Sequence, residues 1–185
     1  MTVERARDIT VLIVEDEREL ADIYAAHLSD EYTVAVVYSG EEAIEVLDDQ
    51  FDIVLLDRRM PVVSGNEVLA YIEEQGFDCR VAMVTAVDPD FDIIDLPLDD
   101  YLVKPVTRET LLETIDRMAQ LKAYDERMQQ LTSKKLKRNV LELEKTSVEL
   151  ARSEEFQQLT DDIEALEAEI EDLTDDLAAD AESQL

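Results

Sequence analysis

The sequence predicts an α/β fold, a doubly wound, five-stranded parallel sheet of strand order 2-1-3-4-5, followed by an all-α helical hairpin or coiled coil. Short β-branched runs alternate with helical patterns five times in roughly the first 120 residues, which is typical of β-α units with right-handed crossovers. These runs are apolar throughout, as expected for parallel strands that are covered on both faces. From about residue 123 onward no strand pattern, Gly or Pro occurs, which predicts helix.

Each predicted strand stops at a charged or turn-forming residue. The strands are expected at residues 9–14, 34–37, 53–56, 80–85 and 101–103. Ser39 is a good N-cap and forms a predicted capping box with Glu42, while Gly76 is expected to end the following helix. The segment 88–98 is bounded by prolines and predicts at best a short, weakly held helix. Thr107 is expected to cap the fifth helix.

Residues 8–121 are therefore expected to form one domain, and residues 122–185 a second, helical one. Residues 122–152 carry eight basic and five acidic side chains, whereas residues 153–185 carry thirteen acidic and none that is basic. Ser153 predicts a break between two helices. They are expected to fold as an antiparallel hairpin or to form one long rod that pairs between subunits. The heptad seam of the second helix comprises Phe156, Leu159, Ile163, Leu166, Ile170, Leu173 and Leu177.

The net charge of −30, from 47 acidic and 17 basic residues, disfavours nucleic acid and anionic membranes as partners. We interpret it as a surface adapted to high salt rather than that of an ordinary acidic protein. The lone Cys79 excludes an intramolecular disulfide. The N-terminal residues lack the apolar region of a secretory signal, and no window is apolar enough to span a membrane, so a cytoplasmic location is expected.

Acidic side chains follow two strands that are neighbours in the predicted order. Glu15 and Asp16 come after the first strand, and Asp57 comes after the third. Carboxylates gathered at the carboxyl edge of a sheet suit Mg²⁺, which prefers hard oxygen ligands. Thr85 ends the fourth strand and offers a hydroxyl to this edge of the sheet. Lys104 ends the fifth strand, where its ammonium could contact an oxygen of a phosphoryl group carried by Asp57. The alternative for Asp57 is a cap on the following helix.

The chain at this point resembles the CheY-like receiver domain of two-component response regulators, over residues 8–121. By this resemblance, Asp57 is the phosphoacceptor for a sensor histidine kinase, and the protein is no conventional enzyme but catalyses only its own phosphorylation and dephosphorylation. Mg²⁺ is implied as the cofactor. The residues that carry the resemblance are Val11-Leu12-Ile13-Val14-Glu15-Asp16-Glu17, Ile53-Val54-Leu55-Leu56-Asp57 with Met60-Pro61, Val84-Thr85-Ala86 and Tyr101-Leu102-Val103-Lys104-Pro105.

The same resemblance implies a role for each site residue. Thr85 and Tyr101 are the switch pair, which alters the face formed by segment 88–98, the fifth strand and the fifth helix. Lys104 contacts the phosphoryl group and precedes a cis peptide bond. The implied metal ligands are Glu15, Asp16, Asp57 and the backbone carbonyl of Arg59.

Two residues depart from the usual pattern of receiver domains. Glu15 stands where Asp is common, and its extra methylene is expected to place it on the metal through water. Arg59 puts a bulky cation two residues after the phosphoacceptor. We expect it to screen the phosphoryl group from water and to lengthen the life of the phosphorylated state.

The helical region resembles the HalX domain that follows receivers in haloarchaeal regulators. One interpretation is an interaction module that pairs with itself or a partner; a homodimer would form through the receiver face or these helices. The alternative is a DNA-binding transcriptional regulator that acts through the basic segment 134–138. The residues that carry this resemblance are Tyr124-Asp125, Ser133-Lys134-Lys135, Leu141-Glu142, Glu144-Lys145 and Ser153-Glu154-Glu155-Phe156.

Overall fold

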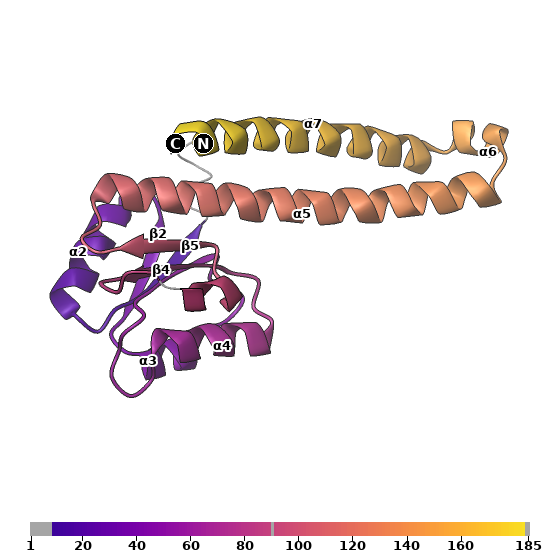
Figure 1. Ribbon diagram of the computed structural model, residues 1–185. Helices are drawn as coiled ribbons and strands as arrows, with labels where there is room; N and C mark the ends of the chain where they lie inside the picture. Colours follow the sequence, from indigo (N-terminus) through magenta and orange to yellow (C-terminus); the bar gives the residue numbers. More distant parts are fainter. Residues whose placement is uncertain (1–8, 90, 184–185) are drawn as a thin grey trace. The chain divides into compact units, whose positions relative to one another are not determined.

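The structure is a computed structural model that describes residues 9–89 and 91–183 (Figure 1). The chain divides into two compact units, Met1–Ala119 and Gln120–Leu185. No helix among the described residues is both long enough and apolar enough to cross a membrane.

The first unit is built on five parallel strands in the order β2-β1-β3-β4-β5, which confirms the predicted fold and strand order. Neighbouring strands are in register so that their carboxyl ends share one edge; Val14 of β1, for example, pairs with Val37 of β2 and Leu56 of β3. The strands are β1 (Thr10–Val14), β2 (Thr33–Val37), β3 (Ile53–Leu56), β4 (Arg80–Thr85) and β5 (Asp100–Val103).

Successive strand residues point to opposite sides of the sheet, so both of its faces carry apolar side chains. Helices cover both faces. On one face, Val11 and Ile13 of β1 pack with α2 (Arg18–Leu28) and with the first turns of α5 (Arg108–Glu144). On the other face, Leu12 and Val14 pack with α3 (Gly40–Val46) and α4 (Gly65–Gln75). The central strand β3 is buried along its whole length, as its apolar run predicts.

Several local signals act as expected. Gly76 ends α4 at φ 71°, a left-handed conformation that Gly adopts without steric cost. The Ser39 hydroxyl caps α3 by accepting from the Glu42 N–H at 3.2 Å, but the Glu42 carboxylate accepts from the Tyr38 N–H rather than from Ser39. In the predicted capping box, the hydrogen bond to the Glu42 carboxylate therefore comes from the residue before Ser39 instead of from Ser39. Among the described residues of segment 88–98, the helical part is a short 3₁₀ helix, η1 (Phe91–Asp95).

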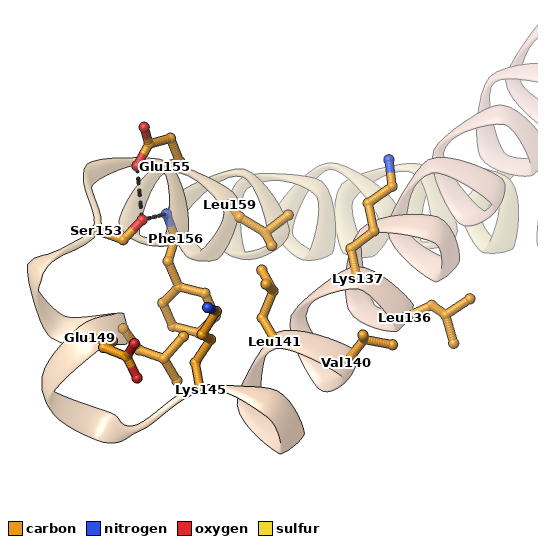
Figure 2. Close-up of a pocket in the computed structure, with 11 residues that line it drawn as sticks. Leu136, Lys137, Val140, Leu141, Lys145, Glu149, Ser153, Glu155, Phe156 and Leu159 are labelled. Atoms are coloured by element: carbon orange, nitrogen blue, oxygen red, sulfur yellow. Dashed lines mark hydrogen bonds between the residues drawn. The ribbon is translucent and has the colours of Figure 1, made fainter.

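The second unit is a helical hairpin made of the end of α5, α6 (Ser147–Arg152) and α7 (Glu154–Ser183). Its helices break twice, at residues 145–146 and at Ser153, where one break was expected. The break at Ser153 is stabilised by its hydroxyl, which accepts from the Phe156 N–H at 3.1 Å and donates to Glu155 (Figure 2).

Charged pairs show that α5 and α7 run antiparallel in this unit. Lys134 pairs with Asp162 at 2.7 Å, and Arg127 pairs with Glu169 at 2.5 Å. Residue numbers that increase along α7 are therefore matched by residue numbers that decrease along α5. The basic part of α5 therefore lies against the acidic α7. Among the described residues of this unit, the buried apolar side chains are Leu131, Ile163 and Leu166, with Leu159 and Ile170 partly buried against them.

Candidate functional site

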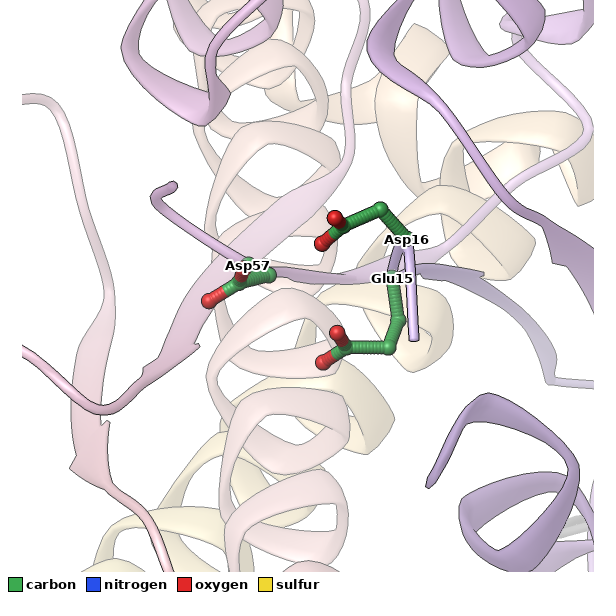
Figure 3. Close-up of side chains that lie close together, drawn as sticks. All are labelled: Glu15, Asp16 and Asp57. Atoms are coloured by element: carbon green, nitrogen blue, oxygen red, sulfur yellow. The ribbon is translucent and has the colours of Figure 1, made fainter. Parts of the chain in front are cut away.

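Three carboxylates meet at the carboxyl edge of the sheet (Figure 3). Glu15 and Asp16 directly follow β1, and Asp57 directly follows β3; the pairing of these strands brings them together. One carboxylate oxygen from each residue lies within 4.8 Å of the others. Glu15 is 2% exposed and Asp57 is 6% exposed, whereas Asp16 is exposed. The predicted cluster is thus present as a partly buried group of hard oxygen donors, a set that fits a divalent cation such as Mg²⁺.

Lys104 reaches this cluster from the end of β5. Its Nζ lies 2.6 Å from a Glu15 oxygen and 3.5 Å from Asp57 Oδ1. Its backbone N–H donates to the Thr85 carbonyl at 2.8 Å, and the Lys104–Pro105 peptide bond is cis. The shorter of the two ion pairs is therefore with Glu15. The extra methylene of Glu15, expected to set its distance from a metal, here lets it pair directly with the lysine.

Burial governs the electrostatics of the site. It raises the pKa of the Asp57 carboxyl above its ordinary value, although the Lys104 ammonium and a hydrogen bond from the Thr85 hydroxyl act in the opposite direction. Burial also raises the pKa of Glu15, against its ion pair with Lys104. Burial disfavours the charge of Lys104 as well, but Glu15 and Asp57 outweigh it and raise the pKa of this lysine. The carboxylates are therefore poorly solvated, a condition that a bound cation relieves.

The predicted switch residues lie on the neighbouring strands. Thr85 is fully buried at the end of β4, where its hydroxyl acts to lower the pKa of Asp57 and accepts from the Val87 N–H at 3.3 Å. The Tyr101 hydroxyl on β5 donates to the Val87 carbonyl at 2.9 Å. Both side chains thus make hydrogen bonds to the same residue, which links them through the backbone after β4.

Arg58, which no sequence motif singles out, connects this pair to the loop that follows Asp57. Its guanidinium donates to the Tyr101 hydroxyl at 3.4 Å and forms an ion pair with Asp92 of η1. The Arg58 side chain is 14% exposed, whereas the neighbouring Arg59 is exposed. The residue directly after Asp57 therefore ties β5 and η1 together.

The loop between β3 and α4 is held by two close backbone approaches. A Cβ at Gly65 would lie 2.2 Å from the Asp57 carbonyl oxygen, and a Cβ at Gly40 would lie 2.4 Å from the Val63 carbonyl oxygen. The Gly65 N–H donates to the Arg58 carbonyl at 3.0 Å, which closes the loop on itself. The chain around Asp57 is thereby fixed by contacts that leave no room for a side chain.

The sheet order and the carboxylate cluster define a CheY-like α/β domain. Residues 11–116 match the response regulator receiver domain, so the chain belongs to this family of two-component signalling proteins. Residues 120–185 match the HalX domain. Both predicted resemblances are confirmed.

Curated relatives match this chain over part of its length. A Haloferax volcanii protein named "Putative transcriptional regulator" is 51% identical over 116 residues, which are 62% of this chain and 20% of that protein. The Streptomyces coelicolor transcriptional regulatory protein CutR is 40% identical over 110 residues, 57% of this chain and 51% of CutR. The chain thus spans from a fifth to about half of these relatives' length. The Haloferax relative agrees with the high-salt interpretation of the acidic composition.

Solved structures show the same fold in the first unit. The Vibrio cholerae chemotaxis protein CheY4 is 27% identical with a TM-score of 0.55, covering 60% of this chain and 98% of CheY4. The Thermotoga maritima response regulator TrrA, solved in complex with Mg(2+)-BeF, is also 27% identical, with a TM-score of 0.53 over 60% of this chain and 98% of TrrA.

Proposed function

We propose that the protein is a response regulator that accepts a phosphoryl group on Asp57 from a sensor histidine kinase in a Mg²⁺-dependent reaction. Residues 8–121 would form the phosphoacceptor domain, and residues 122–185 the helical output domain. The observation that carries the proposal is the Asp57 carboxylate itself, which is 6% exposed and lies within reach of Lys104 and Thr85. A helix cap would not require these neighbours.

Each neighbour has a defined task in the transfer. An oxygen of the Asp57 carboxylate is the nucleophile. Burial raises the pKa of this carboxyl group, so a cation bound at the cluster would favour the ionised form that reacts. Glu15, Asp16, Asp57 and the Arg59 carbonyl would hold Mg²⁺, which when bound offsets negative charge on the phosphoryl oxygens. The Lys104 ammonium neutralises a further oxygen, while its ion pair with Glu15 keeps it at the site. The Thr85 hydroxyl donates to the remaining one.

The signal would leave the site through Thr85 and Tyr101. Drawing the Thr85 hydroxyl onto a phosphoryl oxygen changes the space beside β4 into which the Tyr101 ring packs. Tyr101 and Thr85 both form hydrogen bonds to Val87. Movement of the Thr85 hydroxyl would therefore alter the backbone to which the Tyr101 hydroxyl donates. The face formed by η1, β5 and α5 then rearranges, and η1 is suited to this because it is short and exposed.

Labelling with acetyl phosphate tests the phosphoacceptor. Asp57→Asn is expected to abolish Mg²⁺-dependent labelling of the intact protein, because an amide is not a competent nucleophile. Asp49→Asn, an exposed carboxylate in the loop before β3, is the matched control and should label like the wild type. Full labelling of Asp57→Asn would refute the assignment.

A second candidate is a transcriptional regulator that binds DNA through residues 134–138, and the names of the relatives favour it. The structure weakens the charge argument for it, since Lys134 pairs with Asp162 and Lys135 with Glu167 at 2.5 Å. DNA titration at several salt concentrations separates the two candidates. Binding that is lost when Lys134, Lys135, Lys137 and Arg138 are all changed to Ala would support DNA recognition; absence of binding at every salt concentration would exclude it.

A further inference from the structure

The second unit leaves apolar surface exposed that its own core does not use. Four large apolar side chains between residues 136 and 148 are exposed: Leu136 by 65%, Val140 by 53%, Leu143 by 85% and Val148 by 58%. A two-helix unit of this size has little core to stabilise it, and such units are usually completed by association. The exposed residues cluster at the turn end of the hairpin.

Three of these residues form a seam on α5. Leu136, Val140 and Leu143 are spaced four and three apart, the spacing of heptad positions d, a and d. At 100° per residue they lie on the side of α5 opposite to Leu131 and Lys134, which contact α7. Figure 2 agrees: Leu141 is directed toward Leu159 of α7, whereas Leu136 and Val140 are not.

The seam borders a groove of about 710 Å³ at the same end of the hairpin. Its apolar lining comes from α5, α6 and α7 and includes Leu136, Val140, Leu150 and Phe156. The lining also includes Leu141 and Leu159, so the groove opens between α5 and α7, and the seam residues Leu136 and Val140 form one edge of it.

The charges beside the seam point to the partner. Lys137 and Glu144 both occupy position e of this heptad frame, one on each side of Val140. Neither has an ion-pair partner in the part of the chain that the structure describes, whereas Lys134 and Lys135 on the α7 side of the helix are both paired. In an antiparallel pair of identical helices centred near Val140, Lys137 of one copy lies opposite Glu144 of the other.

We propose that this surface is an interface for a second copy of the same chain, with two α5 helices packed antiparallel about a two-fold axis near Val140. The seam is then self-complementary in both apolar contact and charge, as a two-fold interface requires. This interface deepens the proposed output role of the helices and rests on it. It does not depend on phosphoryl transfer, so its tests use protein without any phosphodonor.

Cysteine crosslinking tests the register. In a Cys79→Ser background of the full chain, Val140→Cys is expected to form a disulfide-linked dimer under mild oxidation, because the two copies of residue 140 meet at the axis. Ser133→Cys, one heptad upstream and also exposed, should not crosslink. Equal crosslinking at both positions would indicate parallel helices, and crosslinking at neither would remove the interface; either result overturns the proposal.

Charge reversal tests the pairing. Sedimentation equilibrium, at the lowest salt at which the chain stays folded, should show about fivefold weaker dimerisation for Lys137→Glu and for Glu144→Lys. The double variant should restore the wild-type affinity. Val140→Asp should give monomers, whereas Val62→Asp, an 86% exposed valine in the first unit, should not. A wild-type chain that is monomeric at every concentration, or a double variant that is no better than the singles, overturns the proposal.

Discussion

The Arg58 guanidinium donates a 3.4 Å hydrogen bond to the Tyr101 hydroxyl, across 43 residues of sequence. Through its ion pair with Asp92 the same side chain also holds η1. The residue that follows the proposed phosphoacceptor therefore braces the two elements that are expected to move.

Removal of this brace should loosen η1. Arg58→Ala loses one charged hydrogen bond and one ion pair to a half-exposed carboxylate, together worth ~1 kcal/mol of local stability. Amide hydrogen exchange in residues 91–95 should become about fivefold faster, while exchange in the central strands stays unchanged. Arg59→Ala, an exposed neighbour, is the control. Unchanged exchange in η1 would show that Arg58 does not hold this segment.

The second prediction concerns the stability cost of the buried Asp57 carboxylate. Without divalent cations, Asp57→Asn should raise the free energy of unfolding at neutral pH by ~1 kcal/mol, because burial raises the pKa of Asp57 and so penalises its charge. A raised pKa contributes stability that is present below the unfolded-state value and is lost as pH rises through the folded-state value. The gain from the substitution should therefore grow with pH across the acidic range.

Denaturant titrations of the wild type and Asp57→Asn in chelator, at a series of pH values, measure this difference. Added Mg²⁺ should reverse it, since a ligand that binds only the folded state stabilises it by about 2.7 kcal/mol at a hundred times its dissociation constant. A variant less stable than the wild type in chelator would contradict the prediction.

Glu15 offers a third test, because it is both in the carboxylate cluster and 2.6 Å from Lys104. Glu15→Gln keeps its size but removes one of three negative charges, so Mg²⁺ affinity should fall by about tenfold. Isothermal titration calorimetry of the intact protein measures this. Glu17→Gln, an exposed carboxylate outside the cluster, should bind Mg²⁺ like the wild type. Unaltered Mg²⁺ affinity in Glu15→Gln would show that Glu15 does not help to bind the metal and only pairs with Lys104.

The fourth prediction addresses Arg59. Its side chain is exposed on the loop two residues after Asp57, and we expect it to screen a phosphoryl group on Asp57 from water. Arg59→Asn is expected to speed the loss of phosphate several-fold, as followed by decay of the labelled protein. Arg59→Lys keeps the charge with less bulk and should give an intermediate rate. An unchanged rate in Arg59→Asn would end this explanation.

The sequence was sufficient for the fold and for the carboxylate cluster because both follow from local patterns. Apolar runs mark the strands, and parallel strands bring their carboxyl ends to one edge, so Glu15 and Asp57 had to meet. Arg58 was missed because its partners lie 34 and 43 residues away and no spacing reveals them. The direct pairing of Lys104 with Glu15, 89 residues apart, depends on side-chain length in three dimensions.

The extra break in the second unit, in contrast, had a readable signal. Thr146 caps α6 and forms a capping box with Glu149, a Thr-x-x-Glu pattern that is visible in the sequence. The two separate alternatives for the helices, a hairpin and a rod, could not be told apart from the heptad pattern, since the same seam serves both.

The tight contact of Gly65 with the Asp57 carbonyl also bears on how this protein can evolve. Even alanine there would place its methyl carbon 2.2 Å from the backbone oxygen of Asp57, the proposed phosphoacceptor. Neighbouring side chains cannot compensate for such a collision, since the obstacle is main chain. In a saturation library, position 65 should therefore accept no other residue, while the exposed Val62, three residues earlier, accepts many. Substitutions at exposed positions of the loop can therefore accumulate in descendants of this sequence, but the glycine is expected to stay unchanged.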